Sequence, residues 1–242
     1  MKRLVAAAVF AFVSAGTLSF CYASDMGPDD LAKAKRAMIE HHLIGRDIRD
    51  PAVLEAMEKV PREEFVEQSQ RMMAYDDNPL PIGHGQTISQ PYIVALMTQA
   101  LRPVKTDRVL EVGSGSGYQA AVLAQIVDHV YTIEIIKPLA DETAKRLARL
   151  GYKNVTVRNG DGYLGWKEHA PFDKIIVTAA ADKVPPPLEE QLKEGGRLIM
   201  PVGGDYLQYL LLGVKRDGRM RYSNITAVRF VPMTGAAEEK ER

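Results

Sequence analysis

Five consecutive residues, Gly113-Ser114-Gly115-Ser116-Gly117, constrain the fold of this chain more than any other segment. They follow an apolar run, Arg108–Val112, and precede Tyr118–Ala124, which has the composition of a helix. A strand, a glycine-rich loop and a helix in this order form the first turn of a doubly wound α/β sheet. Glycines there let the backbone approach a ligand, and the helix directs its N-terminus at it. The segment predicts a Rossmann-like site for a nucleoside cofactor.

The glycine spacing distinguishes between cofactors. A dinucleotide fingerprint requires Gly-x-Gly-x-x-Gly, whereas here Gly117 comes one residue early and Tyr118 stands where the third glycine belongs. With Glu111 in front, the segment reads Glu-x-Gly-x-Gly-x-Gly and resembles the loop of S-adenosylmethionine-dependent methyltransferases. NAD-dependent oxidoreduction is the alternative. We expect S-adenosylmethionine to be bound by Glu111, Gly113, Ser114, Gly115 and Gly117.

Acidic residues accompany the next two predicted strands. Glu134 lies near the end of Val130–Ile135, where a carboxylate can accept from both ribose hydroxyls; the alternative is a solvated glutamate that caps the next helix. Asp161 lies in the turn Asn159–Gly162 and could accept from an adenine amino group; the alternative is an ordinary turn capped by its aspartate. Glu134, Asp161 and Gly162 therefore join the predicted cofactor site.

The end of the fourth predicted strand, Ile175–Ala180, is made of small residues. Methyltransferases that act on exocyclic base amines have an Asn/Asp-Pro-Pro-aromatic tetrad there, so base N-methylation is not expected. Thr178, a further predicted cofactor contact, and Ala179 should line one wall of the pocket. Pro185–Pro187 should form a stiff connector into the next helix.

The composition suits one globular α/β protein. The 242 residues, 46% hydrophobic and 26% charged, are enough to bury a sizeable core. The 31 basic and 31 acidic residues cancel, so no overall basic field attracts a phosphate backbone, and we expect no nucleic-acid partner. The histidines are scattered except for His41 and His42, which as neighbours on a helix face different directions. We expect no metal site.

The first 23 residues have the composition of a secretory signal peptide. Lys2 and Arg3 precede an apolar run from Leu4 to Phe20, and Cys21 and Ala23 are small residues at the positions that a signal peptidase recognises. Cleavage after Ala23 would remove the only cysteine, so a mature chain could form neither a disulfide nor a cysteine-dependent zinc site.

Two alternatives to cleavage remain at this end of the chain. Lipidation of Cys21 is disfavoured by the bulky Phe20 before it, and an uncleaved anchor would be short for a bilayer. We expect an exported, periplasmic protein with no stable membrane anchor after cleavage, or a cytoplasmic one if the segment is not a functional signal.

Residue patterns predict helices and strands that alternate along most of the chain. The expected helices are Pro28–Ile44, Pro51–Val60, Tyr92–Leu101, Pro138–Leu150 and Leu188–Leu192. Further expected strands are Val155–Arg158, Lys174–Val177 and Arg197–Pro201, with a hairpin of Tyr206–Lys215 and Met220–Phe230. We expect a mostly parallel, doubly wound sheet with N-terminal helices and a C-terminal hairpin. The chain divides into a signal peptide (1–23), a helical cap (24–72), a methyltransferase domain (73–237) and a charged tail (238–242).

The stretch Leu80–Pro91 indicates which family of methyltransferases the chain resembles. It closely resembles the corresponding stretch of bacterial protein-L-isoaspartate O-methyltransferases, and the run Gln86–Pro91 before the first strand is specific to them. The resemblance extends from about Ile39 to Met233 and includes Gly160–Gly162, Phe172-Asp173, Glu194–Gly196 and Val228–Pro232.

This resemblance implies a class I methyltransferase fold and methyl transfer to the free carboxylate of L-isoaspartyl residues in damaged proteins, which starts repair through a succinimide. D-aspartyl residues are a further candidate substrate, and the enzyme is expected to be a monomer. The family's active-site serine falls on Ser89. By the same resemblance Thr87, Ile88 and Ser89 contact the cofactor and the substrate carboxylate, while Ile82 and backbone near Val231 hold the substrate peptide.

The chemistry agrees with this assignment. The acceptor carboxylate is already ionised near neutral pH, and the methyl of a sulfonium is electrophilic, so alignment is required rather than a base. The Ser89 hydroxyl would orient one carboxylate oxygen without neutralising it. Ser89 could also, or instead, be the N-cap of the helix that follows, and a non-catalytic module that binds damaged peptide is a further alternative.

Overall fold

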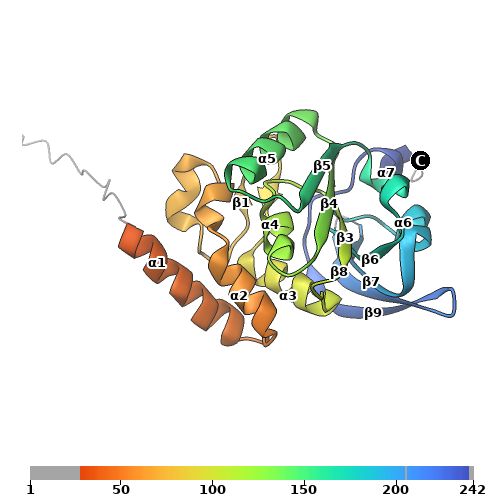
Figure 1. The fold of residues 1–242 in the computed structure, drawn as a ribbon, viewed down its shortest axis with the longest axis horizontal. Coiled ribbons are helices and arrows are strands. Elements are labelled where there is room, and N and C mark those ends of the chain that lie inside the picture. Colours follow the sequence, from red (N-terminus) through yellow and green to blue (C-terminus); the bar gives the residue numbers. More distant parts are fainter. Residues whose placement is uncertain (1–27, 205, 240–242) are drawn as a thin grey trace, which may run out of the picture.

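A seven-stranded sheet forms the centre of the computed structural model, which describes residues 28–204 and 206–239 (Figure 1). Five neighbouring strands run parallel, and the last two are antiparallel. In spatial order the strands are β5 (Val155–Asn159), β4 (His129–Glu134), β3 (Arg108–Val112), β6 (Phe172–Val177), β7 (Leu192–Gly203), β8 (Gln208–Arg216) and β9 (Arg219–Val228). This confirms the predicted fold class.

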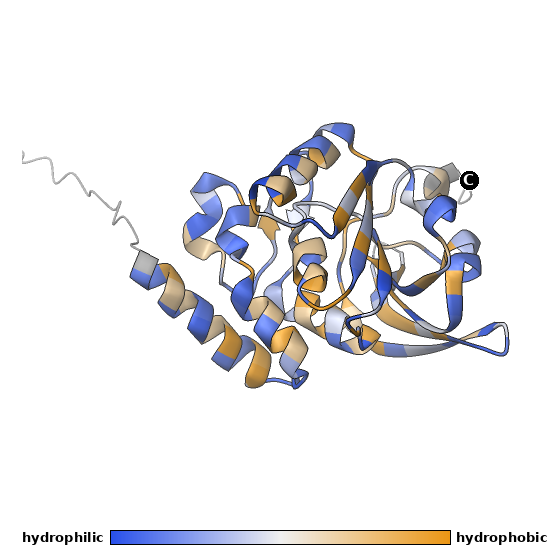
Figure 2. Cartoon of the chain, viewed as in Figure 1, coloured by the Kyte–Doolittle hydropathy of each residue, from blue (hydrophilic) through white to orange (hydrophobic). Residues whose placement is uncertain are grey.

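The two faces of the sheet are both covered, so apolar side chains on both sides of the central strands are buried. Adjacent residues alternate between two core clusters: Val109 and Ile176 belong to one, Leu110 and Ile175 to the other. Figure 2 shows hydrophobic and hydrophilic residues interspersed along the strands. The covering helices are α3 (Pro91–Leu101), α4 (Tyr118–Ala124), α5 (Lys137–Arg149), α6 (Pro186–Gln191) and α7 (Ala236–Glu239).

The N-terminal helices pack on the first of these clusters. They are α1 (Pro28–Ala37), the π-helical η1 (Met38–Ile44) and α2 (Pro51–Lys59), which begins at the cap Asp50. Their buried Met38, Leu43 and Met57 share a core with Val109 of β3, so this cap and the sheet are held by one hydrophobic core. The chain is helical over the whole expected range 28–44, but the second half, Met38–Ile44, has π-helical rather than α-helical hydrogen bonding.

The segment between α2 and α3 is built from short elements. It contains the short 3-10 helices η2 (Arg62–Phe65) and η3 (Gln68–Met73), followed by a two-stranded sheet of β1 (Leu80–Pro81) and β2 (Thr87–Ile88). The connection at its tip has positive φ at Gly83, His84 and Gly85. The hairpin places Thr87, Ile88 and Ser89 directly before α3.

Several expected boundaries differ from the structure. Helix α6 begins at Pro186, because a proline in the first turn needs no N–H partner, so two of the three prolines lie in the helix rather than in the connector. Ser89 is not the N-cap of α3: Gln90 holds that position, and Asp77 Oδ1 accepts from the Tyr92 N–H.

Further differences concern the C-terminal part of the chain. Strand β7 begins at Leu192 rather than Arg197, and β9 ends at Val228 rather than Phe230. The β8–β9 turn is as expected, since Asp217 and Gly218 both have positive φ, as a two-residue hairpin turn requires. Helix α7 extends into the expected tail as far as Glu239; the rest of the tail and the proposed signal peptide lie outside the described residues.

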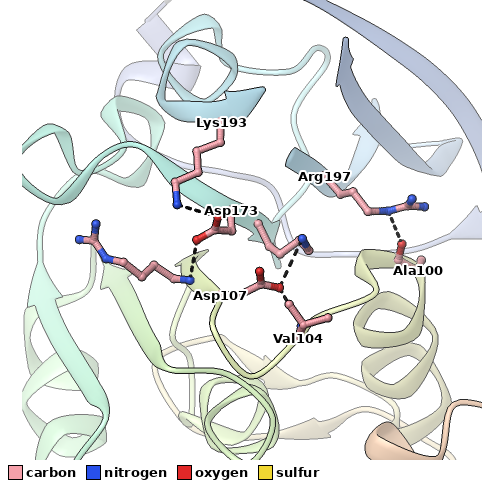
Figure 3. Close-up of polar contacts among 8 residues, drawn as sticks. Ala100, Val104, Asp107, Asp173, Lys193 and Arg197 are labelled. Carbon is pink, nitrogen blue, oxygen red and sulfur yellow. Dashed lines mark hydrogen bonds and ion pairs between the residues drawn. The ribbon is translucent and has the colours of Figure 1, made fainter. Parts of the chain in front are cut away.

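A polar network fixes the amino ends of the central strands, at the edge opposite the site described below (Figure 3). Asp107 accepts from Val104 N and pairs with Lys174, at 2.8 and 3.3 Å. Asp173 accepts from Arg108 N and Lys193 Nζ, at 2.9 and 2.7 Å. Although burial acts to raise the pKa of Asp173, the bond from Lys193 and the bond from the Arg108 N–H hold it below its usual value. These contacts fix the register of β3 and β6 and thus the position of their carboxyl ends.

Candidate active site

A cavity opens at the carboxyl ends of β3, β4 and β6. The strand order reverses between β3 and β6, which is the place where ligands bind in open α/β sheets. The empty space in the cavity and its open mouth amounts to about 850 Å³, which includes open solvent. Its lining comes from the glycine loop (Gly113–Ser116), the end of β4 (Ile133–Ile136), the segment Gln86–Ser89, Gly162, Thr178 and the C-terminal segment Val231–Thr234.

The glycine loop has the conformation that only glycine adopts easily. Gly113, Gly115 and Gly117 have φ of 94°, 51° and 88°. A Cβ on Gly113 would lie 2.4 Å from Thr178 Oγ1, and the Thr178 hydroxyl donates to Gly113 O at 2.6 Å. The loop is therefore packed against the end of β6, and its backbone faces the cavity.

Glu134 is fixed at the end of β4. Its Oε2 accepts from Gly115 N at 2.9 Å and its Oε1 accepts from Ile136 N at 3.0 Å. The side chain is buried but lines the cavity, and each carboxylate oxygen keeps a second lone pair for a ligand hydroxyl. The glycine loop and this carboxylate together fit the nucleoside part of S-adenosylmethionine.

A groove adjoins the cavity. Pro79, Gln90, Ile93 and the segment Ala227–Val231 line it, and four residues line both spaces: Thr87, Ser89, Thr178 and Val231. The hydroxyl of Ser89 makes no hydrogen bond to any residue that the structure describes. Ser89 therefore presents a free donor at the boundary between the cavity and the groove.

The groove wall after β9 is held in place by hydrogen bonds to other parts of the chain. Gln208 donates to Phe230 O and accepts from Phe230 N, at 3.2 and 2.7 Å. Val231 O accepts from Ala180 N at 2.8 Å. These bonds fix the backbone near Val231, which the sequence predicts to hold a peptide.

Most predicted site residues gather here, but four of them do not line the cavity: Ile82, Glu111, Gly117 and Asp161. Asp161 uses both oxygens on backbone: Oδ1 accepts from Tyr163 N and Oδ2 from Ala236 N. Ile82 is buried beneath the glycine loop, close to Gly115. Glu111 is fully buried in β3. Gly117 is the N-cap of α4 and packs against α5. A direct ligand contact for these four residues stays a prediction.

The sequence analysis missed several lining residues. Tyr118 and Gln119, in the first turn of α4, line the cavity, and their place directly after the glycine loop could have revealed them. Pro232, Met233 and Thr234 reach it only because the chain returns to Ala180 after β9, where Met233 N donates to Ala180 O. No local sequence pattern predicts that the chain returns to this edge of the sheet.

Among the described residues, no group of three or more His, Cys, Asp or Glu could hold a metal ion, and no helix is long and apolar enough to cross a membrane.

The raised pKa of the buried Glu111 should make the free energy of unfolding fall as pH rises. Neither carboxylate oxygen has a hydrogen-bond partner within the described structure. Burial raises the pKa of Glu111 to about 8; the nearby Thr132 hydroxyl opposes this and the Glu134 charge adds to it. An unfolded glutamate ionises near about pH 4.3. Between these values the folded state retains a proton that the unfolded state releases, so folding stability declines through this window and levels off above it.

Urea unfolding of the cofactor-free protein between about pH 5 and 8 measures this effect. Glu111→Gln should remove a decline of a few kcal/mol from the unfolding free energy, whereas the exposed Glu58→Gln should leave it unchanged. An unfolding free energy with the same pH dependence in wild type and Glu111→Gln would contradict the assignment.

Solved structures with the same fold identify the class. A protein-L-isoaspartate O-methyltransferase structure aligns with a TM-score of 0.77 and 30% identity, covering 86% of this chain and 67% of that one. A Plasmodium falciparum structure, described as a beta-aspartate methyltransferase in complex with S-adenosyl-L-homocysteine, aligns with a TM-score of 0.70 and 29% identity, covering 85% and 97%. The fold and the cavity thus define a class I S-adenosylmethionine-dependent methyltransferase.

The sequence comparisons specify the family. The model of the protein-L-isoaspartate(D-aspartate) O-methyltransferase family matches residues 33–238. A protein-L-isoaspartate O-methyltransferase of Opitutus terrae is 60% identical over 198 residues, 81% of this chain and 85% of that protein. One of Syntrophobacter fumaroxidans is 60% identical over 194 residues, 79% and 78% of the two chains. The chain belongs to this family.

Proposed function

We propose that this protein transfers a methyl group from S-adenosylmethionine to the free carboxylate of L-isoaspartyl residues in damaged proteins, which starts their repair. The observation that carries the proposal is the shared lining of the cavity and the groove. A cofactor in the cavity and a peptide in the groove would meet at Ser89, Thr87, Thr178 and Val231. The names of the relatives and the family model support the same reaction.

The residues present fit the cofactor. Bound S-adenosylmethionine supplies an electrophilic methyl on a positively charged sulfonium. The positive-φ loop at Gly113 and Gly115 lets backbone approach the ligand, and Glu134 offers acceptors for ribose hydroxyls. Among the residues that line the cavity, Glu134 alone carries a charge, so no lysine or arginine there opposes a sulfonium cation.

The chain's task in the reaction is alignment. An isoaspartyl carboxylate is ionised near neutral pH and needs no general base. The Ser89 hydroxyl would donate to one carboxylate oxygen and leave the other free to attack, and the walls of the cavity would exclude water. Orienting two reactants in this way can lower a barrier by about 7 to 11 kcal/mol. This explains an active site without a histidine, cysteine or lysine in its lining.

Repair is tested by following an isoaspartyl peptide during prolonged incubation with the enzyme and S-adenosylmethionine. The backbone nitrogen should attack the ester carbonyl and expel methanol to form a succinimide, whose hydrolysis returns part of the peptide to the aspartyl form. Chromatography separates the two isomers. We expect the aspartyl peptide to accumulate only when cofactor and enzyme are both present. No accumulation with an enzyme that binds the cofactor would contradict the proposal, and a D-aspartyl peptide in a parallel sample tests the second substrate.

We further propose that the protein is exported to the periplasm and acts as a monomer. The support for export is the basic start, the apolar run from Leu4 to Phe20 and the small residue Ala23. Cell fractionation with N-terminal sequencing should find a periplasmic chain that starts at Ser24. A cytoplasmic chain that retains Lys2 and Arg3 would contradict export, and light scattering of the purified protein checks the monomer.

A further inference from the structure

Arg62, in η2, is an unusual residue for the core of a protein. Its side chain is fully buried and is the largest among the fully buried side chains of the described residues. Arginine is almost never fully buried unless it is paired, and no carboxylate lies within ion-pair distance of its guanidinium among the described residues. Burial without such a partner costs several kcal/mol, so packing alone does not account for an arginine here.

The guanidinium instead contacts backbone and an aromatic ring. Nε donates to Ala74 O and Nη2 donates to Ser89 O, each at 2.7 Å. The guanidinium carbon lies 4.7 Å from the centre of the Tyr118 ring, within the range of cation–π attraction. Nη1 has no hydrogen-bond partner among the described residues.

These contacts join the segments that form the site. Ala74 and Ser89 are the two ends of the stretch that contains the β1–β2 hairpin, and one planar guanidinium holds both ends. Tyr118 is the first residue of α4, directly after the glycine loop, and lines the cavity. Arg62 thereby fixes Ser89, at the boundary with the groove, relative to the loop that faces the cofactor. Two donors on a rigid fork suit this task better than the single ammonium of lysine.

We propose that Arg62 is a positioning residue for methyl transfer, which holds Ser89 at a fixed distance from the first turn of α4 and so aligns the acceptor carboxylate with the cofactor. The proposal rests on the reaction proposed above. Arg62 touches neither substrate nor cofactor and acts through the backbone of Ser89. Its loss should therefore affect the rate of the chemical step more than cofactor binding.

The test compares Arg62→Met and Arg62→Lys with the control Leu43→Ala. The control removes a buried side chain of η1 from the core cluster that also contains Ala74 and Tyr118. All are assayed well below their unfolding midpoints with an isoaspartyl peptide. Because a misplacement near 1 Å can cost about 100-fold in rate, we expect Arg62→Met to lower kcat by about 100-fold with little change in the Kd for S-adenosylhomocysteine. Arg62→Lys should recover part of kcat, and Leu43→Ala should lower the Tm but keep kcat.

A double-mutant cycle separates positioning from stability. If Arg62 acts by placing the Ser89 hydroxyl, Arg62→Met should lower kcat much less in a Ser89→Ala background than in wild type. If Arg62→Met does not fold, Arg62→Lys takes its place in the double-mutant cycle with Ser89→Ala. A kcat within about twofold of wild type in both Arg62 variants, or fully additive effects, would overturn the proposal. An inactive wild type would instead contradict the proposed function itself.

Discussion

Replacing Gly113 with alanine should reduce the affinity for S-adenosylmethionine by at least about 100-fold, which corresponds to about 2.7 kcal/mol. The new Cβ would lie 2.4 Å from Thr178 Oγ1. Thr178 has little freedom to move away, because its hydroxyl donates to both Val112 O and Gly113 O. The φ of 94° adds strain for a residue with a side chain. The loop must therefore shift, and its backbone loses its place at the cofactor. Isothermal titration with S-adenosylmethionine or S-adenosylhomocysteine measures the change.

Gly151→Ala is the matched control for backbone strain. Gly151 has a φ of 83°, follows α5 and has nothing within 4 Å of the position of an added Cβ. Its variant should lose some stability but bind the cofactor as wild type does. Equal affinities of the Gly113→Ala protein and wild type would show that the glycine loop does not hold the cofactor.

Replacing Ser89 with alanine should lower kcat by about 10- to 100-fold, the usual effect of losing a hydrogen bond to a charged group. The hydroxyl has no other partner among the described residues, so its removal leaves the surrounding hydrogen bonds intact. The bond from Arg62 ends on the backbone oxygen and is also retained. Stability and cofactor affinity should consequently stay near the wild-type values. Steady-state methylation of an isoaspartyl peptide with saturating cofactor gives kcat and KM.

Ser89→Thr is the control for the hydroxyl, since it keeps a donor at the same Cβ and adds only a methyl group. We expect it to retain more activity than Ser89→Ala. Wild-type kcat and KM in Ser89→Ala would contradict this role of Ser89. Another residue that lines both the cavity and the groove would then orient the acceptor carboxylate, and Thr87 is the nearest of these in the chain.

The sheet could be predicted from sequence because its determinants are local. Buried parallel strands such as Arg108–Val112 are continuous apolar runs, and the loop that follows β3 needs glycine at defined positions. The hairpin turn at Asp217-Gly218 has an equally local cause. The Gln86–Pro91 stretch pointed to the family, and the structure places Thr87, Ile88 and Ser89 in the cavity wall.

The rest depends on contacts between residues far apart in the chain. Asp77 accepts from the N–H of Tyr92, 15 residues further along the chain, and Asp161 accepts from Ala236 N near the end of the chain. Neither bond could be predicted from neighbouring residues, because the partner of each carboxylate lies far along the chain. Glu111 is the acidic residue of the glycine-loop motif. Its complete burial results from the packing of β3 in the sheet and could not be predicted from the motif. No sequence pattern around Arg62 predicts its hydrogen bond to Ser89 O.

Transfer of labelled methyl from S-adenosylmethionine to two peptides of the same sequence, one with L-isoaspartate and one with L-aspartate, tests the proposed function most directly. We expect a base-labile methyl ester on the isoaspartyl peptide and none on the aspartyl peptide. The free carboxylate of isoaspartate is its α-carboxylate, and a peptide held along the groove near Val231 would present that group at Ser89. Equal labelling of both peptides, or no ester on the isoaspartyl peptide with an enzyme that binds the cofactor, would contradict it.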